Sequence, residues 1–220
     1  MNPPGRSTVI DISPPLGPMI ATFPGDTPLT REILQDFERG DSLTLSTLRA
    51  TVHLGAHLDA PLHYGAGQKS IDQLPLELFV GPCRVVPIPA RRAERIGWEE
   101  IRAALGDEPP TERLLLSTGS YPDPNRFDPD FAGLDPAAVR RLGALGVRLL
   151  GVDTPSVDPA DSRDLPAHGA CLESGITILE GLVLAGVAAG CYELTALPLP
   201  LVGFEASPVR AVLRPLRRDG

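Results

Sequence analysis

Three of the four histidines of this chain lie within eleven residues and share that stretch with an aspartate. The stretch reads HLGAHLDAPLH from residue 53 to residue 63. If residues 51–59 form a strand, side chains two positions apart point to the same face, so His53, His57 and Asp59 face one space. Gly55 leaves room between them. Two imidazoles and a carboxylate on one face suit a borderline cation such as zinc.

A histidine in a strand is more often a hydrogen-bonded core residue or a surface residue than a metal ligand. For this cluster that alternative carries a large cost, because each unpaired buried polar group is penalised by roughly 2–7 kcal/mol. A bound metal ion removes the penalty. The spacing therefore favours a metal site over a purely structural cluster.

His63 follows Asp59 by four residues and lies beyond Pro61, so we expect it to leave the strand and to sit at the rim of the site. Histidine has an unperturbed pKa of about 6.5, which allows it to accept and donate protons near neutral pH. We therefore predict that His63 is a proton shuttle. The alternative is a histidine that supports a ligand or only faces solvent.

The fourth histidine, His168, lies in the segment 164–173, which has Pro166 near its start and Gly175 after its end, as expected for a helix. Glu180 follows His168 by twelve residues. In an unbroken helix the two side chains would point about 120° apart. A helix followed by a strand can instead return the chain to the same pocket. The sequence leaves open whether it does.

The segments around these residues alternate between strand-like and helix-like patterns. Short apolar runs bounded by turn residues are typical of strands buried in a sheet, and helical spacing that ends near a glycine is typical of helices. The expected strands are 9–12, one or two within 43–59, 83–88, 113–118, 147–153, 176–179, 192–199 and 207–216, and the expected helices are 98–105, 136–142 and 164–173. This alternation predicts an α/β fold in a single domain over residues 1–220.

Composition narrows the possible partners. The chain has 220 residues, 42% of them hydrophobic, and a formal net charge of −8, which works against binding a polyanion such as DNA or RNA. No apolar run approaches the roughly 20 residues that span a bilayer, and residues 1–13 lack the pattern of a signal peptide. We expect a cytoplasmic protein that acts on a small molecule and binds neither nucleic acid nor a membrane.

The three cysteines, Cys83, Cys171 and Cys191, have no CxxC spacing. Neither a disulfide framework nor a cysteine-type zinc site is indicated. We expect all three to be buried as small apolar side chains.

The stretch from His53 to His63 resembles the signature HxGTHxDxPxH of the cyclase family of metal-dependent hydrolases, whose members include the bacterial kynurenine formamidases. Further blocks look similar to that family in the same order, so the resemblance covers nearly the whole chain. These blocks are residues 11–15, 23–28, 81–85, 151–156, 178–182 and 206–211. The resemblance implies a swivelling β/β/α domain, with a mixed sheet and flanking helices, that assembles as a homodimer or homotetramer.

The resemblance also implies a site with two zinc ions per subunit. His53, His57 and Asp59 would hold the first ion. Asp59 and Glu180 would bridge to a second ion that His168 also binds. Two bridged zinc ions would lower the pKa of a shared water towards 7 and polarise a carbonyl, so hydrolysis is the natural reaction.

The implied reaction is the hydrolysis of N-formyl-L-kynurenine to L-kynurenine and formate, with His63 as the catalytic acid and base. Two departures from the family pattern stand out. Ala56 replaces the threonine of the signature, and Phe23 replaces a substrate-contacting tryptophan. Phe23 keeps an aromatic face for the substrate but lacks the indole N–H. The alternatives are a relative that acts on another amide, lactam or cyclic imide, as isatin hydrolases do, or a noncatalytic relative that binds a metal or a small ligand.

Overall fold

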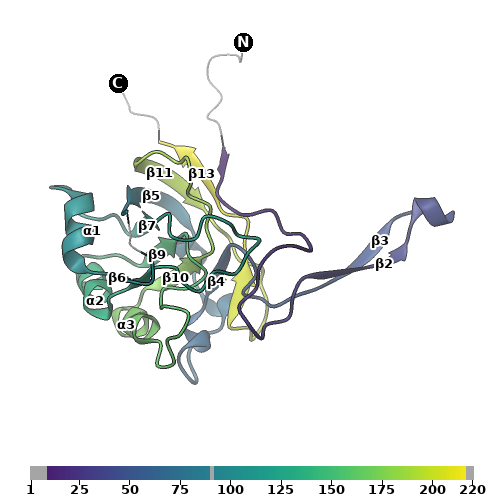
Figure 1. The fold of residues 1–220 in the computed structure, drawn as a ribbon, viewed down its shortest axis with the longest axis horizontal. Coiled ribbons are helices and arrows are strands. Elements are labelled where there is room, and N and C mark those ends of the chain that lie inside the picture. The colour runs from purple at the N-terminus through teal and green to yellow at the C-terminus, as the bar shows by residue number, and fades with distance from the viewer. Residues whose placement is uncertain (1–8, 90–91, 217–220) are drawn as a thin grey trace, which may run out of the picture.

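In the computed structural model, which describes residues 9–89 and 92–216, one curled sheet of nine strands forms the framework (Figure 1). In spatial order the strands are β1 (Ile10–Asp11), β13 (Val212–Pro215), β11 (Gly190–Thr195), β5 (Val80–Pro87), β7 (Arg113–Ser117), β9 (Leu149–Val152), β10 (Thr177–Glu180), β4 (His57–Asp59) and β12 (Ala206–Pro208). Two further short strands, β6 (Arg95–Ile96) and β8 (Gly133–Leu134), pair with each other. Because β1 pairs with β13, the sheet joins segments from opposite ends of the sequence.

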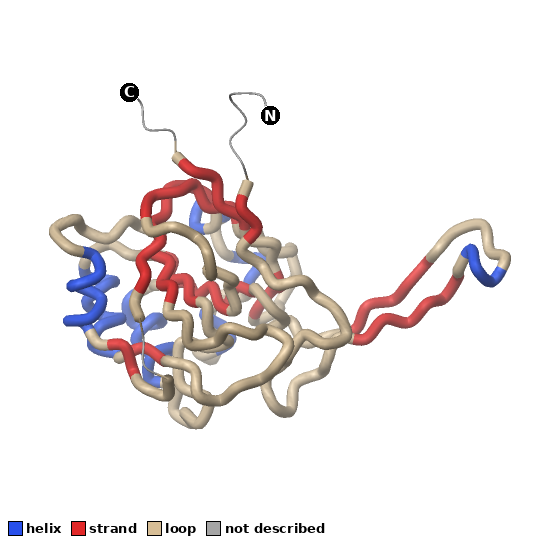
Figure 2. Tube along the Cα trace, turned by 45° about the horizontal axis from the view of Figure 1, so that its top comes forward, coloured by secondary structure: helices blue, strands red, loops and turns tan. Residues whose placement is uncertain are grey.

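The four central strands, β5, β7, β9 and β10, run parallel. Parallel neighbours need crossover connections, and the helices α1 (Trp98–Leu105), α2 (Pro136–Ala144) and α3 (Pro166–Ser174) lie in these connections. All three helices gather on the same side of the sheet (Figure 1, Figure 2). This arrangement confirms the expected α/β fold with a mixed sheet and flanking helices. No helix in the described part of the chain is long and apolar enough to cross a membrane.

Three of the central strands, β7, β9 and β10, are buried on both faces. On β7, Leu114 and Leu116 belong to the core beneath the helices, whereas Leu115 belongs to the core on the opposite face. On β10, Ile178 and Leu179 divide between the two cores in the same way. The sequence shows continuous apolar runs here because neither face of these strands meets water.

Strand β4 lies between β10 and β12 and is antiparallel to both. All three residues of β4 are buried. The register places His57 opposite Glu180 of β10 and Asp59 opposite Ile178. Residues that lie more than a hundred positions apart in the sequence therefore become direct neighbours.

Of the segment 51–59, only His57–Asp59 forms a strand, so the strand expected to carry His53 does not reach it. The other strand within 43–59 is β3 (Leu45–Arg49), and a loop joins the two strands. Gly55 in this loop has a φ of +58°, a left-handed conformation that favours glycine. The alternation of side chains along a strand therefore does not explain the position of His53, which depends on this turn.

A β-hairpin over residues 30–49, called the arm below, projects from the body of the molecule (Figure 1, Figure 2). Its strands β2 (Thr30–Gln35) and β3 form a separate two-stranded sheet. Large apolar side chains on the arm, including Phe37 and Leu48, are exposed. The sequence pattern did not predict β2, because a strand that is exposed on both faces shows no alternation of apolar and polar residues.

The cysteines correct one expectation. Cys83 and Cys171 are buried as expected, but Cys191 is exposed. Cys191 lies on β11, where the buried Tyr192 and Leu194 alternate with the less buried Cys191 and Glu193. The side-chain alternation of a strand with one solvent-facing side therefore places Cys191 at the surface.

Gly181 allows the chain after β10 to pass directly against the loop before β4, and Gly55 in that loop leaves room for the segment around Leu16. Gly181 has a φ of +67°, and a Cβ atom on it would lie 2.1 Å from the carbonyl oxygen of Gly55. A Cβ atom on Gly55 would in turn lie 2.6 Å from the side chain of Leu16. This close approach holds the segments that carry His57 and Glu180 against each other.

We expect Gly181→Ala to lower the free energy of unfolding by about 2–5 kcal/mol, because it combines left-handed strain with a backbone clash. Gly175→Ala is the matched control: its φ is +66°, and a Cβ atom there meets nothing within 4 Å. The control should cost only about 1–2 kcal/mol. Urea unfolding of both variants measures the difference, and equal losses would contradict the close approach.

Candidate metal centre

Strands β4 and β10 supply three buried polar side chains that face one another: His57, Asp59 and Glu180. The Nε2 atom of His57 lies 3.4 Å from Oε2 of Glu180 and 3.5 Å from Oδ1 of Asp59. The Nδ1 atom of His57 lies 2.9 Å from the carbonyl oxygen of Gly55. A carbonyl can only accept, so Nδ1 carries the hydrogen and Nε2 is free to face the carboxylates.

The turn at Gly55 brings His53 to the same place from the loop. Its Nδ1 atom lies 3.0 Å from Oδ1 of Asp59, and its ring centroid lies 5.1 Å from that of His57. Its Nε2 atom lies 3.7 Å from Oε1 of Glu205. The grouping of His53, His57 and Asp59 that the spacing suggested is therefore present, although a turn rather than a strand produces it.

Helix α3 brings His168 into the cluster. Its Nε2 atom lies 3.7 Å from Oδ2 of Asp59 and 3.8 Å from Oε1 of Glu180. His168 lies in the first turn of α3, and Glu180 is the last residue of the following strand. Because α3 and β10 belong to one helix and strand unit, the start of the helix and the end of the strand lie at the same edge of the sheet. This topology answers the question that the sequence left open.

The carboxylate of Asp59 tests whether these residues fit a cation. Both of its oxygen atoms are buried, and neither has a hydrogen-bond partner in the described part of the chain. Potential ligand atoms of His53, His57 and Asp59 lie within 4.8 Å of one another, and so do those of Asp59, His63 and His168. An unpartnered buried carboxylate surrounded by imidazole nitrogens is the donor set of a divalent metal site.

The charged groups of the cluster shift one another's pKa values. Burial alone would lower the pKa of His57, but its hydrogen bond to Glu180 and the charges of Asp59 and Glu180 raise that pKa to about 9. Burial likewise opposes protonation of His168, yet Asp158 and Asp59 raise its pKa to about 10. Burial would raise the pKa of Asp59, but the neighbouring histidines hold it well below its usual range. Without a metal, protons on the histidines compensate the buried carboxylates.

His63 lies at the rim of the cluster. The chain leaves β4 through a short 3₁₀ helix at Pro61–His63, and the His63 side chain is exposed. Its ring centroid lies 4.2 Å from that of His53 and 5.9 Å from that of His168. Loss of hydration lowers the pKa of His63; the charge of Asp59 opposes this shift, and the charges of His53 and His168 reinforce it. A neutral imidazole therefore stands between the cluster and solvent.

The cluster forms one wall of a cavity of about 350 Å³. The carboxyl ends of the parallel strands β7, β9 and β10 deliver Ser117, Asp153 and Glu180 to this cavity, where open α/β sheets usually bind ligands. The other walls are mainly apolar and aromatic. They include Ile20, Phe23, Tyr121, Phe127, Leu182 and Leu184.

Phe23, expected to contact substrate, lines this cavity and stands edge-on to Phe127, with ring centroids 5.0 Å apart. Sequence reasoning did not find Phe127 or Tyr121, because both lie in the irregular loop between β7 and β8, where no motif marks them. It also did not single out Asp153. This buried carboxylate accepts hydrogen bonds from the backbone N–H groups of Thr118 and Gly119 and so fixes the start of that loop.

A family model matches about two thirds of the chain, and solved structures match almost all of it. The model of the family Cyclase, described as “Putative cyclase”, matches residues 10–159. A solved structure of a “Potential Metal-Dependent Hydrolase With Cyclase Activity” is 26% identical with a TM-score of 0.81, and the match covers 96% of this chain and 100% of that chain. A predicted metal-dependent hydrolase from Bacillus stearothermophilus is 27% identical with a TM-score of 0.80, over 96% and 99% of the two chains. Isatin hydrolase A from Labrenzia aggregata shares the fold, with a TM-score of 0.78 and 23% identity over 94% and 93% of the chains.

We expect the metal-free protein to lose stability as the pH rises from 6.5 to about 9. The buried thiol of Cys83, whose pKa is raised to about 12, does not titrate in this window. The folded pKa values of His57 and His168 are raised, so the folded state holds more protons than the unfolded state in this window. The stability that this provides is complete below pH 6.5 and is lost as the pH approaches the folded values. Thermal unfolding of chelator-treated protein measures the slope.

A divalent cation should replace those protons. Calorimetric titration with zinc in buffers of different ionisation enthalpy should therefore report release of about two protons per chain near pH 7.5. The zinc-loaded protein should show a flatter stability profile. A metal-free profile that rises with pH over this window would contradict the proposed charge state.

Proposed function

Because the chain belongs to the cyclase family of metal-dependent hydrolases, we propose that it hydrolyses an aryl formamide, with N-formyl-L-kynurenine as the best-fitting substrate. The products would be formate and L-kynurenine. One observation carries the proposal: residues of the histidine and carboxylate cluster line the same cavity as the aromatic residues Phe23 and Phe127, which contact each other. Such a cavity can hold an aryl ring while its amide carbonyl lies at the cluster.

The proposal includes two zinc ions per chain. Five side chains would hold them, with Asp59 and Glu180 shared between the ions: His53, His57, Asp59, Glu180 and His168. When bound, such ions lower the pKa of water towards neutrality and polarise a carbonyl. The buried oxygen atoms of Asp59 support this assignment: nitrogen atoms of His53 and His168 lie 3.0 Å and 3.7 Å from them, but no described residue donates a well-aligned hydrogen bond to them, and a cation between these groups would satisfy both.

We assign the proton transfer to His63. Hydrolysis adds water to the formyl carbon and breaks its bond to the aniline nitrogen, which must gain a proton as it leaves. The lowered pKa of His63 keeps its ring neutral near pH 7, so a ring nitrogen can accept a proton from the attacking water. The same nitrogen can then deliver that proton to the leaving amine. Exposure of His63 at the cavity rim also allows exchange of protons with solvent.

The aromatic wall supports an aryl group on the substrate. Phe23 and Phe127 meet edge to face, so each presents a ring to the cavity while the pair fixes its own orientation. An additional ring stacked in such a site contributes about 0.5–1.5 kcal/mol beyond the burial of its area. An aliphatic formamide would lack that contribution.

The charged residues around the cavity indicate how the amino-acid end of the substrate would bind. The described residues that line it include no lysine or arginine, whereas Asp26 lies in its wall. No described residue donates a hydrogen bond to the Asp26 carboxylate, so it is available to a ligand. We propose that Asp26 attracts the α-ammonium group of N-formylkynurenine and that the α-carboxylate stays at the solvent-exposed mouth.

We extend the proposal to a homodimer in which the arm of each copy packs on the other. A two-stranded hairpin on its own is marginally stable in water, and Phe37 and Leu48 on the arm are exposed. The body also exposes apolar side chains, including Val202 and Phe204 in the connection between β11 and β12. Two apolar surfaces on one chain can be covered reciprocally by a twofold-symmetric pair.

We expect His63→Ala to lower kcat by about 10²–10⁴-fold, the usual contribution of a positioned acid or base. The bound zinc should stay unchanged, and added imidazole should restore part of the rate. Elemental analysis and steady-state kinetics test both points. Because His63 also lies within ligand distance of Asp59 and His168, loss of zinc in this variant would show that His63 is a ligand instead.

The substrate is tested by comparing kcat/KM for N-formylkynurenine, formanilide, an aliphatic formamide and isatin. We expect both aryl formamides to exceed the aliphatic one by at least about 2–10-fold from ring contact. Asp26→Asn should lower kcat/KM for N-formylkynurenine about tenfold, as for loss of a hydrogen bond to a charged group, and leave formanilide unchanged. Phe23→Trp should improve the first substrate. Isatin preferred by more than about tenfold would overturn the formamide proposal and leave the metal-dependent hydrolase.

The homodimer is tested by sedimentation equilibrium. We expect a mass of about twice that of the chain for the wild-type protein. A double substitution on the arm, Phe37→Ser with Leu48→Ser, should shift the equilibrium towards the monomer because it removes apolar surface from the interface. A monomeric wild-type protein would contradict this part of the proposal.

A further inference from the structure

The first turn of α3 is capped by a residue from outside the helix. The N-cap position, Leu165, makes no side-chain hydrogen bond to the helix. The carboxylate of Asp158 instead accepts hydrogen bonds from the backbone N–H groups of Ala167 and His168, at 3.0 Å each to its Oδ2 atom. Asp158 is completely buried, so the N–H groups at the start of the helix replace water as hydrogen-bond donors to this carboxylate.

The same carboxylate also contacts the His168 ring. Its Oδ2 atom lies 2.9 Å from Nδ1 of His168. An ionised carboxylate can only accept, so the hydrogen of the ring lies on Nδ1. The Nε2 atom is then directed towards Asp59 and Glu180, at 3.7 Å and 3.8 Å from their nearest oxygen atoms.

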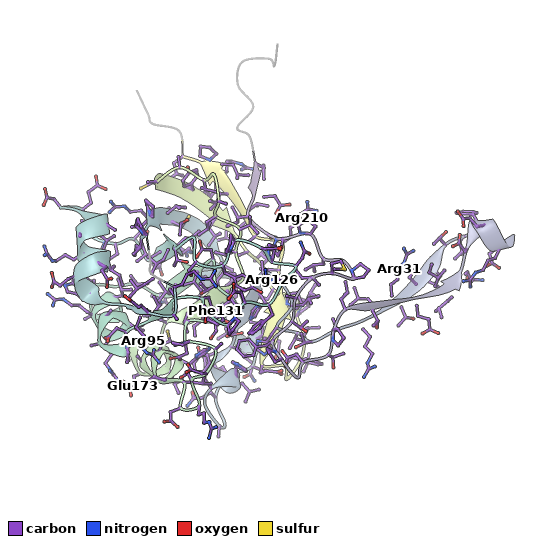
Figure 3. All side chains as sticks on the ribbon, in the orientation of Figure 1. Arg31, Arg95, Arg126, Phe131, Glu173 and Arg210 are labelled. Carbon is purple, nitrogen blue, oxygen red and sulfur yellow. The ribbon has the colours of Figure 1, made fainter. Side chains whose placement is uncertain are left out.

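Arg95 fixes the other side of Asp158. Its Nη1 atom lies 3.0 Å from Oδ1 of Asp158 and also donates to the carbonyl oxygen of Leu134. Arg95 belongs to β6 and lies on the helical side of the molecule (Figure 3). The guanidinium has no contact with His168 in the interactions of the described residues, so any influence on that ring passes through Asp158.

The residue before Asp158 fixes the position of the Glu180 carboxylate. The backbone N–H of Val157 donates a hydrogen bond of 2.7 Å to Oε1 of Glu180. Two consecutive residues therefore hold one histidine and one glutamate of the cluster in their relative positions. Asp158 lies outside the sequence blocks that resemble the cyclase family, which end at Ser156 in this region.

We propose that Asp158 is a positioning residue for the second metal ion, and that Arg95 holds Asp158 in place. This inference rests on the ligand set of the proposed function, in which His168 and Glu180 bind that ion. Asp158 fixes which ring nitrogen of His168 is free and where it points. Removing such a partner of a ligating histidine typically weakens metal affinity by about 10–100-fold.

The experiment is a zinc titration of chelator-treated protein against a chromophoric competitor. Asp158→Asn keeps the size of the side chain but offers a single acceptor oxygen for the helix end and the ring together. We expect its second dissociation constant to rise about 10–100-fold, while the first stays within about threefold of wild type because His53 and His57 do not touch Asp158. Cobalt in place of zinc gives an absorption spectrum that reports the change in coordination directly.

Asp135→Asn is the matched control. Asp135 caps α2 by accepting hydrogen bonds from the N–H groups of Ala137 and Ala138, and it lies outside the cavity wall. Because asparagine caps a helix about as well as aspartate, this substitution should change the melting temperature little and leave both zinc affinities unchanged. If Asp158→Asn lowers the melting temperature but binds both ions like wild type, Asp158 is only a helix cap and the inference is overturned.

Arg95→Gln keeps the inference testable if Asp158→Asn does not fold. It removes the charge that orients Asp158 without altering the carboxylate or the ring, and we expect a smaller rise in the second dissociation constant, about 3–10-fold. No change in this variant would overturn the role assigned to Arg95 and Asp158. If the wild-type protein binds only one ion, the ligand set of the proposed function is wrong. This outcome is distinct from failure of the inference about Asp158, because it is seen in the wild-type protein before any substitution is made.

Discussion

The carboxylate of Asp59 is completely buried, and neither of its oxygen atoms accepts a hydrogen bond from a described residue. A buried carboxylate has lost its hydration. Removing the positively charged groups that compensate it would therefore destabilise the folded state by several kcal/mol. The compensation comes from histidines that reach Asp59 from three parts of the chain: the loop before β4, β4 itself and α3. Protons on these histidines or a bound cation can balance the charge. The surrounding fold is arranged so that one or the other must be present.

The sheet supplies the geometry that this balance needs. Parallel strands end at one edge, so Asp153 and Glu180 arrive at the cavity together, and α3 begins at that edge because it precedes β10. Antiparallel β4 then sets His57 opposite Glu180 through backbone register rather than through any side-chain attraction. Gly181 permits the chain after β10 to contact the backbone of the loop before β4. The rigid part of the site thus follows from strand order, and the loops supply the remainder of the cavity.

The residues suited to catalysis and the residues suited to substrate selection therefore lie on different parts of the fold. His57, Asp59, Glu180 and His168 of the cluster lie on strands and on a capped helix, where hydrogen bonds fix the backbone, whereas His53 lies in the loop before β4. The aromatic side chains lie on two loops: Phe23 precedes the arm, and Phe127 lies between β7 and β8. Their edge-to-face contact joins these two loops in the wall of the cavity. Loops tolerate substitution better than the strands that carry them, so the cavity wall can vary on this scaffold while the histidine and carboxylate cluster stays in place.

The sequence by itself determined the local features of this protein. The buried strands and the three helices could be predicted because periodicity reports the backbone within a few residues, and the spacing of His53, His57 and Asp59 indicated a metal site. What only the tertiary structure decided are the contacts between distant segments. The meeting of His168 and Glu180 with Asp59, the support of His168 by Asp158 and the pairing of Phe23 with Phe127 depend on strand order and loop paths. Exposed strands such as β2, and turns such as that at Gly55, escaped prediction as well. Periodicity records which face of an element meets a core, and it carries no information about which other segment forms that core.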